Sequence, residues 1–586
     1  MKFRNPRLVL LFALGFFFFR IVVGSAFSLD REAFTFVDYD LNVRVEPEQQ
    51  RLGVRGKITL RNDSPTPQKV AVLQISSSLD WRSIKAADKG LQFVSQTYTS
   101  DVDHTGALSE SIVTLPLAIA PQGTVELEIA YEGVIVLDAT RLTRLGMSAA
   151  QANSSDWDQI STKFTAIRGA GNVAWYPVAT EGASLSEGRD LFDALARWKF
   201  REAASKMHLH VDVSEDDGER PELLVNDASC QVMYESRGRA VLLSADCTYK
   251  ALGLVVPAFV VANYEVVERA AVAVHYLHGH EASATSYADA AEKVIPFVTE
   301  WFGAARSRAQ TADLTDPNAA PFESGPWLLT ALVSTDSKLA GLAATHQLTH
   351  AAFSSPRPWI NEGLAHFAQA LYLEHRTGRQ AALDYMGLHR SAFIDAQTEN
   401  EKPTTARRSE DEASQSLVNT VDEELYRSKA MCVWWMLRDM VGDQALKKAI
   451  ASYRPEQDKE PSYMPRLIQT QTQHDLEWFF DDWVYRDRGL PDFKVESVFP
   501  RKTLKESYML TITVDNLGAA GAEVPLTVKS AGGEITNRIE VRAKSKTVIR
   551  MEASALPVEI VVNDGSVPES DMTNNVFKVE ASDAPK

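Results

Sequence analysis

The chain has 586 residues, of which 45% are hydrophobic and 24% are charged, so a multidomain globular protein is expected and a disordered chain is excluded. The formal net charge is −17, and it becomes −21 without residues 1–26, which carry four basic residues and no acidic ones. This excess of acid argues against nucleic acid and against anionic lipid as partners.

Residues 1–26 are typical of a secretory signal peptide. Basic residues precede an apolar run over residues 8–19, and Gly24, Ser25 and Ala26 provide small residues for cleavage. The run is short for a membrane-spanning helix and Arg20 interrupts it, with an uncleaved anchor as the alternative. We therefore predict an exported protein, periplasmic or secreted, with no stable membrane span after cleavage.

Residues 27–270 are predicted to form an N-terminal β-sandwich or saddle. Stretches such as FTFVDYDLNVRVE alternate apolar and polar residues, and turn residues separate these stretches. His208 and His210 alternate with apolar residues on one side of such a strand. We interpret both histidines as structural.

The three cysteines show no metal-cluster pattern. Cys230 and Cys247 flank a predicted hairpin, where an exported compartment would permit a disulfide, and two unpaired core cysteines are the alternative. Cys432 lies in an apolar helical run and is expected to be buried and inert.

Residues 271–490 change to helical periodicity, for example in SKLAGLAATHQLTHAAF and PWINEGLAHFAQALYLEHRTG. Residues 491–586 return to short alternating strands, which predicts a C-terminal immunoglobulin-like β-sandwich. The expected fold class is therefore multidomain α+β, with a mainly helical domain between two β domains.

The stretch THQLTHAAFSSPRPWINEGLAHF, residues 345–367, carries the clearest chemical pattern. His346 and His350 are four residues apart on a predicted helix, so their side chains share one face. The prolines that follow predict a turn, after which Glu362 on a second helix can fold back toward the histidines. Two histidines and one glutamate leave a fourth position open, which is the pattern of a catalytic site with one zinc ion.

With these motifs the chain resembles the aminopeptidase N-like (membrane alanyl aminopeptidase) family of gluzincin zinc metallopeptidases. The resemblance spans the whole chain and implies a β-saddle, a thermolysin-like helical peptidase domain and a C-terminal β-sandwich. His346 and His350 match the zinc histidines of the family's H-E-x-x-H, and Glu362 matches the zinc glutamate of its W-x-N-E-G. Tyr426, in ELYRSKAM, resembles the tyrosine that stabilises the oxyanion. The family implies hydrolysis of peptide bonds at the N-terminus of peptide or protein substrates.

Three departures from the family pattern bear on activity. Eleven residues separate His350 from Glu362, where the family usually has eighteen. The family's G-x-M-E-N is missing in that form; Glu323, in APFESGPW, is the candidate for its substrate-binding glutamate, with an ordinary loop glutamate as the alternative. Gln347 stands where the family has its general base.

Gln347 is expected to weaken catalysis because a carboxamide cannot accept a proton at neutral pH. Loss of a positioned general base costs about 10²–10⁴ in rate, so Gln347→Glu is expected to raise hydrolysis about 100-fold or more. Glu323, Glu423 and Glu424 are candidate substitutes for the base. We therefore predict a weakened zinc-dependent, aminopeptidase-like hydrolase. The alternatives are a catalytically inactive pseudopeptidase whose cleft binds a peptide or partner protein, and a structural protein without tight zinc.

Overall fold

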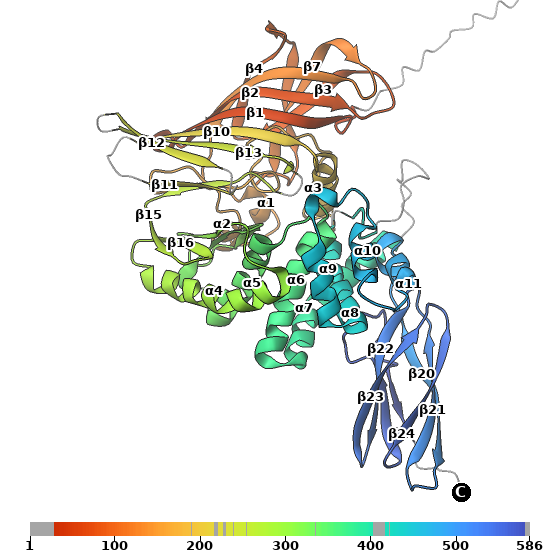
Figure 1. Ribbon diagram of the computed structural model, residues 1–586. Coiled ribbons are helices and arrows are strands. Elements are labelled where there is room, and N and C mark those ends of the chain that lie inside the picture. Colours follow the sequence, from red (N-terminus) through yellow and green to blue (C-terminus); the bar gives the residue numbers. More distant parts are fainter. Residues whose placement is uncertain are drawn as a thin grey trace, which may run out of the picture.

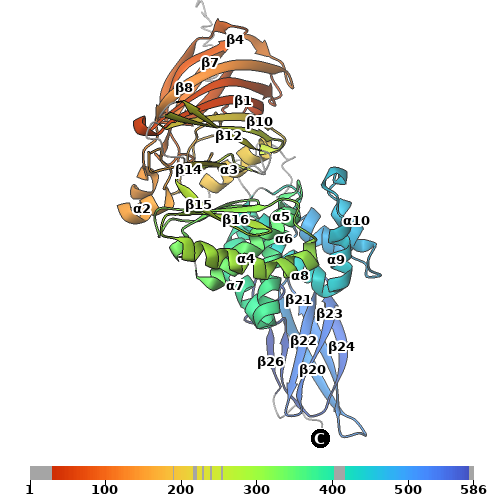
Figure 2. The same ribbon diagram turned by 60° about the vertical axis from the view of Figure 1, so that its left-hand side comes forward.

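The computed structural model runs from the N-terminal sheets through a helical centre to a C-terminal sandwich, which lies at the opposite end of the molecule (Figures 1 and 2). Residues 1–28 are outside the described part of the chain, so the signal peptide stays a prediction. The described residues are 29–188, 190–215, 221–226, 230–237, 240–252, 255–334, 336–401, 416–420 and 422–579.

A large sheet with the strand order β12-β13-β10-β1-β2-β8-β4-β5 dominates the N-terminal region. Along β1, Tyr39, Leu41 and Val43 are buried, whereas the alternate residues Asp40 and Asn42 are exposed, as the sequence alternation predicts. The strands are β1 (Phe34–Glu46), β2 (Arg51–Asn62), β4 (Leu79–Ala86), β5 (Lys89–Gly90), β8 (Thr124–Val134), β10 (Lys206–Glu215), β12 (Gln231–Arg237) and β13 (Ala240–Tyr249).

Smaller elements complete this region. A second sheet pairs β3 (Gln68–Ser76), β7 (Ala107–Ile119) and β6 (Phe93–Thr99), and a third pairs β11 (Glu222–Val225), β14 (Phe259–Ala262) and β9 (Phe164–Ile167). The helices are α1 (Thr140–Thr143), α2 (Ala149–Ser155) and α3 (Asp190–Arg201). Cys230, which directly precedes β12, and Cys247 on β13 form a disulfide, so they are not the two unpaired cysteines of the alternative.

The central region combines a mixed sheet with packed helices. The sheet has the order β15-β16-β17-β19-β18, with β15 (Tyr264–Glu268), β16 (Val272–Leu277), β17 (Ala309–Asp313), β19 (Trp327–Thr330) and β18 (Phe322–Ser324). Because β15 pairs with β16, this sheet begins a few residues before the predicted boundary at 271. β18 is an edge strand of this sheet.

The helices of this region pack around a shared core in which Trp359, Trp434 and Trp435 are fully buried. Cys432 is buried and free, as predicted. The helices are α4 (Glu281–Phe302), α5 (Ser337–Ala352), α6 (Pro358–Thr377), α7 (Arg379–Glu401), the π-helical turn η4 (Glu424–Lys429), α8 (Ala430–Val441), α9 (Asp443–Ser452), α10 (Tyr463–Gln469), α11 (Glu477–Phe480) and the π-helical turn η6 (Asp481–Tyr485). Among the described residues, none of the helices combines the length and apolar character needed to cross a bilayer.

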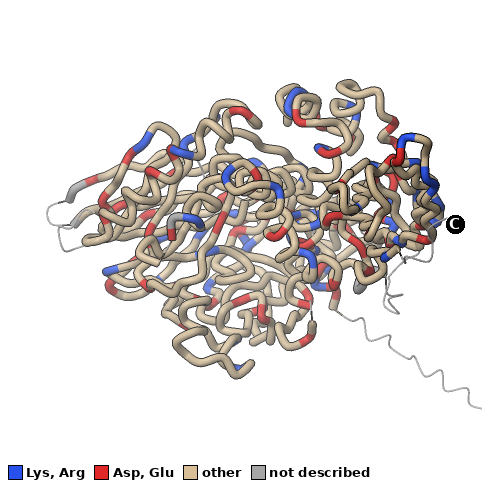
Figure 3. The backbone as a smooth tube through the Cα atoms, turned by 90° about the horizontal axis from the view of Figure 1, so that it is seen from below, with Lys and Arg blue, Asp and Glu red and all other residues tan. Residues whose placement is uncertain are grey.

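The C-terminal region is a sandwich of two sheets, in agreement with the strand pattern. One sheet is β20 (Phe493–Lys502), β21 (Tyr508–Asn516) and β24 (Lys546–Ala553); the other is β23 (Gly533–Val541), β22 (Ala522–Ser530), β25 (Pro557–Val562) and β26 (Val576–Lys578). The Trp483 indole on η6 donates to the carbonyl of Gly521 at 2.7 Å, and the Gly521 amide donates to Asp482 at 2.9 Å. These bonds fix the sandwich to the helical region. Basic and acidic residues are interspersed along the described part of the backbone (Figure 3).

Candidate metal centre

The turn between α5 and α6 brings the predicted ligands together. The Asp336 side chain caps α5 by accepting from the amides of Lys338 and Leu339, each at 2.8 Å. Pro358 occupies the first turn of α6, where its missing N–H costs nothing. Between the helices the Ser355 amide donates to the Asn361 side chain at 3.0 Å, which closes the turn.

His346, His350 and Glu362 converge as the sequence predicts. Their ligand atoms all lie within 4.8 Å of one another. The two histidine Nε2 atoms are 3.1 Å apart, and Glu362 lies 3.3 Å from His350 Nε2 and 3.7 Å from His346 Nε2. We call these three residues the helical triad.

The helical triad fits a zinc ion in its inner shell. Tetrahedral zinc with Zn–N bonds of about 2.0–2.1 Å requires neighbouring ligand atoms about 3.4 Å apart, and the three separations lie close to this value. Both histidines are buried, and burial lowers the pKa of His346, which favours the neutral ring that ligates metal. Although burial opposes ionisation of Glu362, His350 and Arg427 outweigh it and hold the pKa of Glu362 well below its usual range.

The surroundings of the helical triad fit zinc less well. A metal-ligating histidine usually donates its second ring N–H to a carboxylate, carbonyl or water. The Nδ1 atom of His346 is buried and has no partner within the described chain. The Nδ1 atom of His350 lies 3.3 Å from the Asn361 amide nitrogen, while the Asn361 oxygen already accepts from Ser355. The His366 ring, one helical turn after Glu362 on α6, packs on the His346 ring with centroids 4.9 Å apart.

A cation that sequence reasoning missed lies beside Glu362. Arg427 Nε is 3.4 Å from Glu362 Oε2, and Arg427 Nη1 bonds Glu423 at 3.1 Å. Lys199 on α3 forms an ion pair with Glu423 at 2.8 Å. The series Glu362, Arg427, Glu423 and Lys199 thus connects the helical triad to the N-terminal region through alternating charges. Arg427 follows Tyr426 directly, yet no spacing rule distinguishes it from an ordinary helix-surface arginine.

Tyr426 is less accessible than a hydroxyl that is free to donate to an oxyanion. Tyr426 is buried, and its hydroxyl is influenced by the nearby Glu423 carboxylate. Burial and the neighbouring Glu423 charge raise the pKa of Tyr426 well above its usual value, so it remains a neutral donor. It lies within electrostatic reach of Glu362, and its role in stabilising an oxyanion stays a prediction.

The Gln347 side chain is committed to the mixed sheet. Its Nε2 donates to the carbonyls of Gln310 at 2.8 Å and Pro326 at 3.0 Å. Its Oε1 accepts from the hydroxyls of Tyr287 at 3.2 Å and Thr311 at 3.3 Å. The residue is 2% exposed. An ionised glutamate at this position would face the same two carbonyl oxygens without a proton to donate.

The three glutamates considered as substitutes for a base lie in different surroundings. Glu323, on the edge strand β18, places Oε2 3.5 Å from His346 Nε2. Glu423 is held ionised, because Lys199 and Arg427 lower its pKa strongly. Glu424 accepts from the Ser428 hydroxyl at 3.0 Å. Of the three, Glu323 is the one in contact with a residue of the helical triad.

Comparison with known proteins supports the metallopeptidase resemblance for part of the chain. Residues 356–483 match the model of the Peptidase family M1 domain. The matched segment contains Glu362 and Tyr426 and begins after His346 and His350. No curated protein matches the chain. Peptidases of the matched family are zinc-dependent and act on peptides, so the match supports a protein of the metallopeptidase and hydrolase class.

Proposed function

We propose that this protein is exported, binds one zinc ion at the helical triad and holds peptide segments there as a pseudopeptidase. The observation that supports this most is the hydrogen bonding of Gln347, which leaves no proton acceptor at the position of the general base. When bound, zinc supplies a Lewis acid that polarises a peptide carbonyl and activates water. Without an acceptor for the proton, turnover is expected to fall by about 10²–10⁴.

The edge strand β18 supports peptide binding next to the helical triad. As the last strand of its sheet, β18 can pair its outer backbone groups with an extended peptide, in the manner of β-strand addition. Glu323 on this strand is partly exposed and contacts His346, so it can meet the free amine of such a peptide. Arg427, 3.4 Å from Glu362, places a cationic donor beside the helical triad.

Export rests on the signal-like residues 1–26 together with the disulfide. Cys230 and Cys247 are joined, and disulfides persist mainly in oxidising compartments outside the cytosol. The proposal is therefore a periplasmic or secreted protein, anchored at its N-terminus only if the signal is retained.

A second candidate function is a working peptidase in which Glu323 takes over as general base. The contact of 3.5 Å between Glu323 and His346 favours it. In this case Glu323→Gln would remove hydrolysis, whereas in the pseudopeptidase it would weaken only peptide binding.

The experiment that tests the proposal combines metal analysis, peptide binding and hydrolysis on the purified mature protein. We expect the protein to contain one equivalent of zinc, which His350→Ala removes. Short peptides should bind saturably, and a chelator should weaken this binding. Aminoacyl-arylamides and internally quenched peptides should not be hydrolysed appreciably. Rapid hydrolysis that chelator stops and zinc restores would overturn the pseudopeptidase, and its loss in Glu323→Gln would establish the second candidate. His278→Ala is the matched control, because His278 is 96% exposed and contacts only Glu265 among the described residues.

A further inference from the structure

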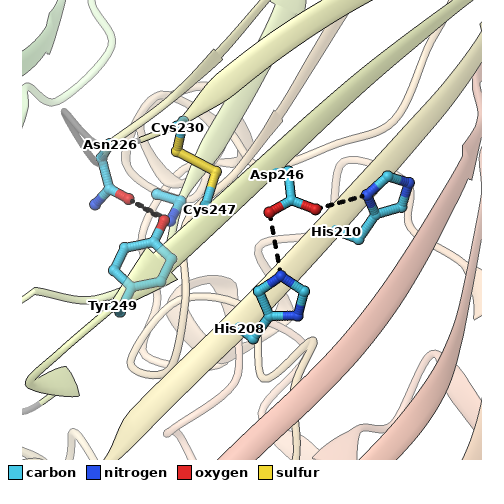
Figure 4. Close-up of a disulfide and its surroundings, with 8 residues drawn as sticks. His208, His210, Asn226, Cys230, Asp246, Cys247 and Tyr249 are labelled. Carbon is cyan, nitrogen blue, oxygen red and sulfur yellow. Dashed lines mark hydrogen bonds and ion pairs between the residues drawn. A yellow bond between two sulfur atoms is a disulfide. The ribbon is translucent and has the colours of Figure 1, made fainter.

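A second histidine cluster lies on the exposed face of the large N-terminal sheet. His208 and His210 are on β10, and Asp246 on β13 stands directly opposite His210. Because residues two apart on a strand share a face, both rings project to the same side as Asp246. Figure 4 shows the Asp246 carboxylate between the two imidazoles. We call these three residues the strand cluster.

Each imidazole of the strand cluster directs one nitrogen to Asp246. His208 Nε2 lies 3.1 Å from one carboxylate oxygen, and His210 Nδ1 lies 3.4 Å from the other (Figure 4). The side chains of His208, His210 and Asp246 are 48%, 28% and 45% exposed, so an ion from solvent can reach them.

The other nitrogen of each ring faces a separate carboxylate. His208 Nδ1 lies 3.0 Å from Asp40 on β1, and His210 Nε2 lies 3.2 Å from Asp212 on β10. Asp212 is itself fixed by the Ser244 hydroxyl at 2.7 Å. A carboxylate on the far side of a ligating imidazole is the outer arrangement that orients histidines in metal sites.

With two neutral imidazoles, the strand cluster has fewer N–H groups than nitrogen–carboxylate contacts. A neutral imidazole has one N–H, and an ionised carboxylate only accepts hydrogen bonds. The four nitrogen–carboxylate contacts need four N–H groups, whereas two neutral rings supply two. If both N–H groups point outward to Asp40 and Asp212, two ring lone pairs and the Asp246 carboxylate face each other. Two protonated rings would satisfy all four contacts. A metal ion placed between the rings would take the place of these protons.

We propose that His208, His210 and Asp246 bind a divalent transition-metal ion such as Zn²⁺, Ni²⁺ or Cu²⁺. Imidazole nitrogens with a carboxylate suit these ions, and the exposed side leaves room for water ligands. Among the described residues, the helical triad is the one group with its ligand atoms all within 4.8 Å of one another. Binding at the strand cluster therefore needs the exposed Asp246 carboxylate to rotate out from between the rings and both imidazoles to turn toward one ion. The disulfide of Cys247, the residue after Asp246, ties β13 to the chain that leads into β12 and fixes the backbone beneath the site.

The test measures Zn²⁺ and Cu²⁺ binding to the full chain carrying His346→Ala and His350→Ala, so that the helical triad does not contribute. We expect one ion per chain, lost or weakened more than about tenfold in His208→Gln and in His210→Gln, and retained with the control His278→Gln. Equal binding in all these variants would overturn the proposal, as would the absence of any ion in the parent.

A second measurement separates the metal site from a mere group of surface ion pairs. The electron paramagnetic resonance spectrum of one equivalent of Cu²⁺ should show two coordinated imidazole nitrogens in the parent and one in either histidine variant. Asp40→Asn should weaken binding by about 10–100-fold, the usual effect of losing an outer partner. Asp80→Asn, an exposed aspartate on β4, is its control and should leave binding unchanged. A spectrum without imidazole nitrogens in the parent would refute the assignment.

Discussion

The helical triad and the strand cluster bring two histidines and a carboxylate together in opposite ways. In the triad the ligand atoms already surround one point, since residues four apart on α5 face a second helix that folds back. In the strand cluster Asp246 keeps the two rings apart, but both rings have an outer carboxylate. The triad therefore has the better inner shell, and the cluster has the better outer shell.

Burial separates the two sites further. His346 and His350 are 3% and 7% exposed, so an ion in the helical triad would be shielded and slow to exchange. The strand cluster is open to solvent, so its ion would exchange quickly and bind more weakly. The secondary structure that carries the ligands thus determines how closely they converge and how exposed they are. The helices bury the triad, whereas the sheet face leaves the strand cluster exposed to solvent.

The largest expected effect concerns the inner shell of the helical triad. His350→Ala removes a ligand 3.3 Å from Glu362, and we expect zinc affinity there to fall by more than the roughly 10–100-fold that an outer partner contributes. Chelator competition followed by metal analysis measures this. Binding at the strand cluster should be unchanged, so a uniform loss at both sites would indicate unfolding instead of ligand removal.

Gln347→Glu tests whether a carboxylate at position 347 can act as the general base of peptide hydrolysis. From the sequence alone the substitution restores a base and raises hydrolysis about 100-fold or more. In the structure the new carboxylate would face the carbonyls of Gln310 and Pro326, so we expect a loss of about 1–3 kcal/mol in stability and no gain in hydrolysis.

Urea denaturation and a peptide hydrolysis assay check both parts of this expectation for Gln347→Glu. Gln369→Glu is the matched control, because the buried Gln369 amide donates to a single carbonyl, that of Leu342, and should cost less. A stable, zinc-loaded Gln347→Glu protein with at least 100-fold faster hydrolysis would show that the side chain can turn toward the triad.

Local patterns predicted the inner shell of the helical triad well. The spacing of His346 and His350, the proline turn and the W-x-N-E-G segment are all contained in 23 consecutive residues, 345–367. Gly363 in that segment has a further role: a Cβ there would lie 2.7 Å from the Ala430 Cβ, so glycine permits close packing of α6 on α8. The mixed α+β character, with several sheets and packed helices, also followed from strand and helix periodicity.

The features that the sequence did not reveal depend on distant contacts. The orientation of Gln347 is fixed by β17 and by Pro326 before β19, neither of which its own helix specifies. Arg427 lies in a π-helical turn, whose wider period changes which side chains share a face. The strand cluster also depends on a distant contact, because Asp40 is 168 residues from His208 and only the sheet register joins them. The interpretation of His208 and His210 as structural therefore stays a prediction beside the proposed metal site.

A buried acid in the N-terminal region adds a pH effect that must be separated from metal binding at the strand cluster. Burial raises the pKa of Glu202 to about 8, although the Tyr39 hydroxyl donates to it at 2.7 Å. Between its ordinary value near 4.5 and about 8, the folded form keeps a proton that the unfolded form loses. Stability should therefore fall as pH rises through this window, by about 1.4 kcal/mol per pH unit.

Glu202→Gln cannot ionise and should remove this slope, whereas the exposed Glu187→Gln should keep it. Urea denaturation of wild type and both variants at pH 5, 6, 7 and 8, followed by near-ultraviolet circular dichroism, gives the comparison. Parallel curves for wild type and Glu202→Gln would show that Glu202 is already ionised in the folded protein. The strand cluster should then be studied at the pH where the fold is most stable.

Arg427→Gln is expected to have the smallest effect on zinc affinity, and whether the affinity rises or falls reveals the role of Arg427. The guanidinium lies 3.4 Å from Glu362 Oε2, so it competes with a metal ion for that carboxylate and repels the ion through space. Its removal should raise zinc affinity at the helical triad by about threefold to tenfold and leave the strand cluster unaffected. Arg438→Gln on α8, whose partners are Glu374 and Asp443, is the control. A fall in affinity would mean that Arg427 orients Glu362 toward the metal, and the triad would then have the outer partner that His346 and His350 lack.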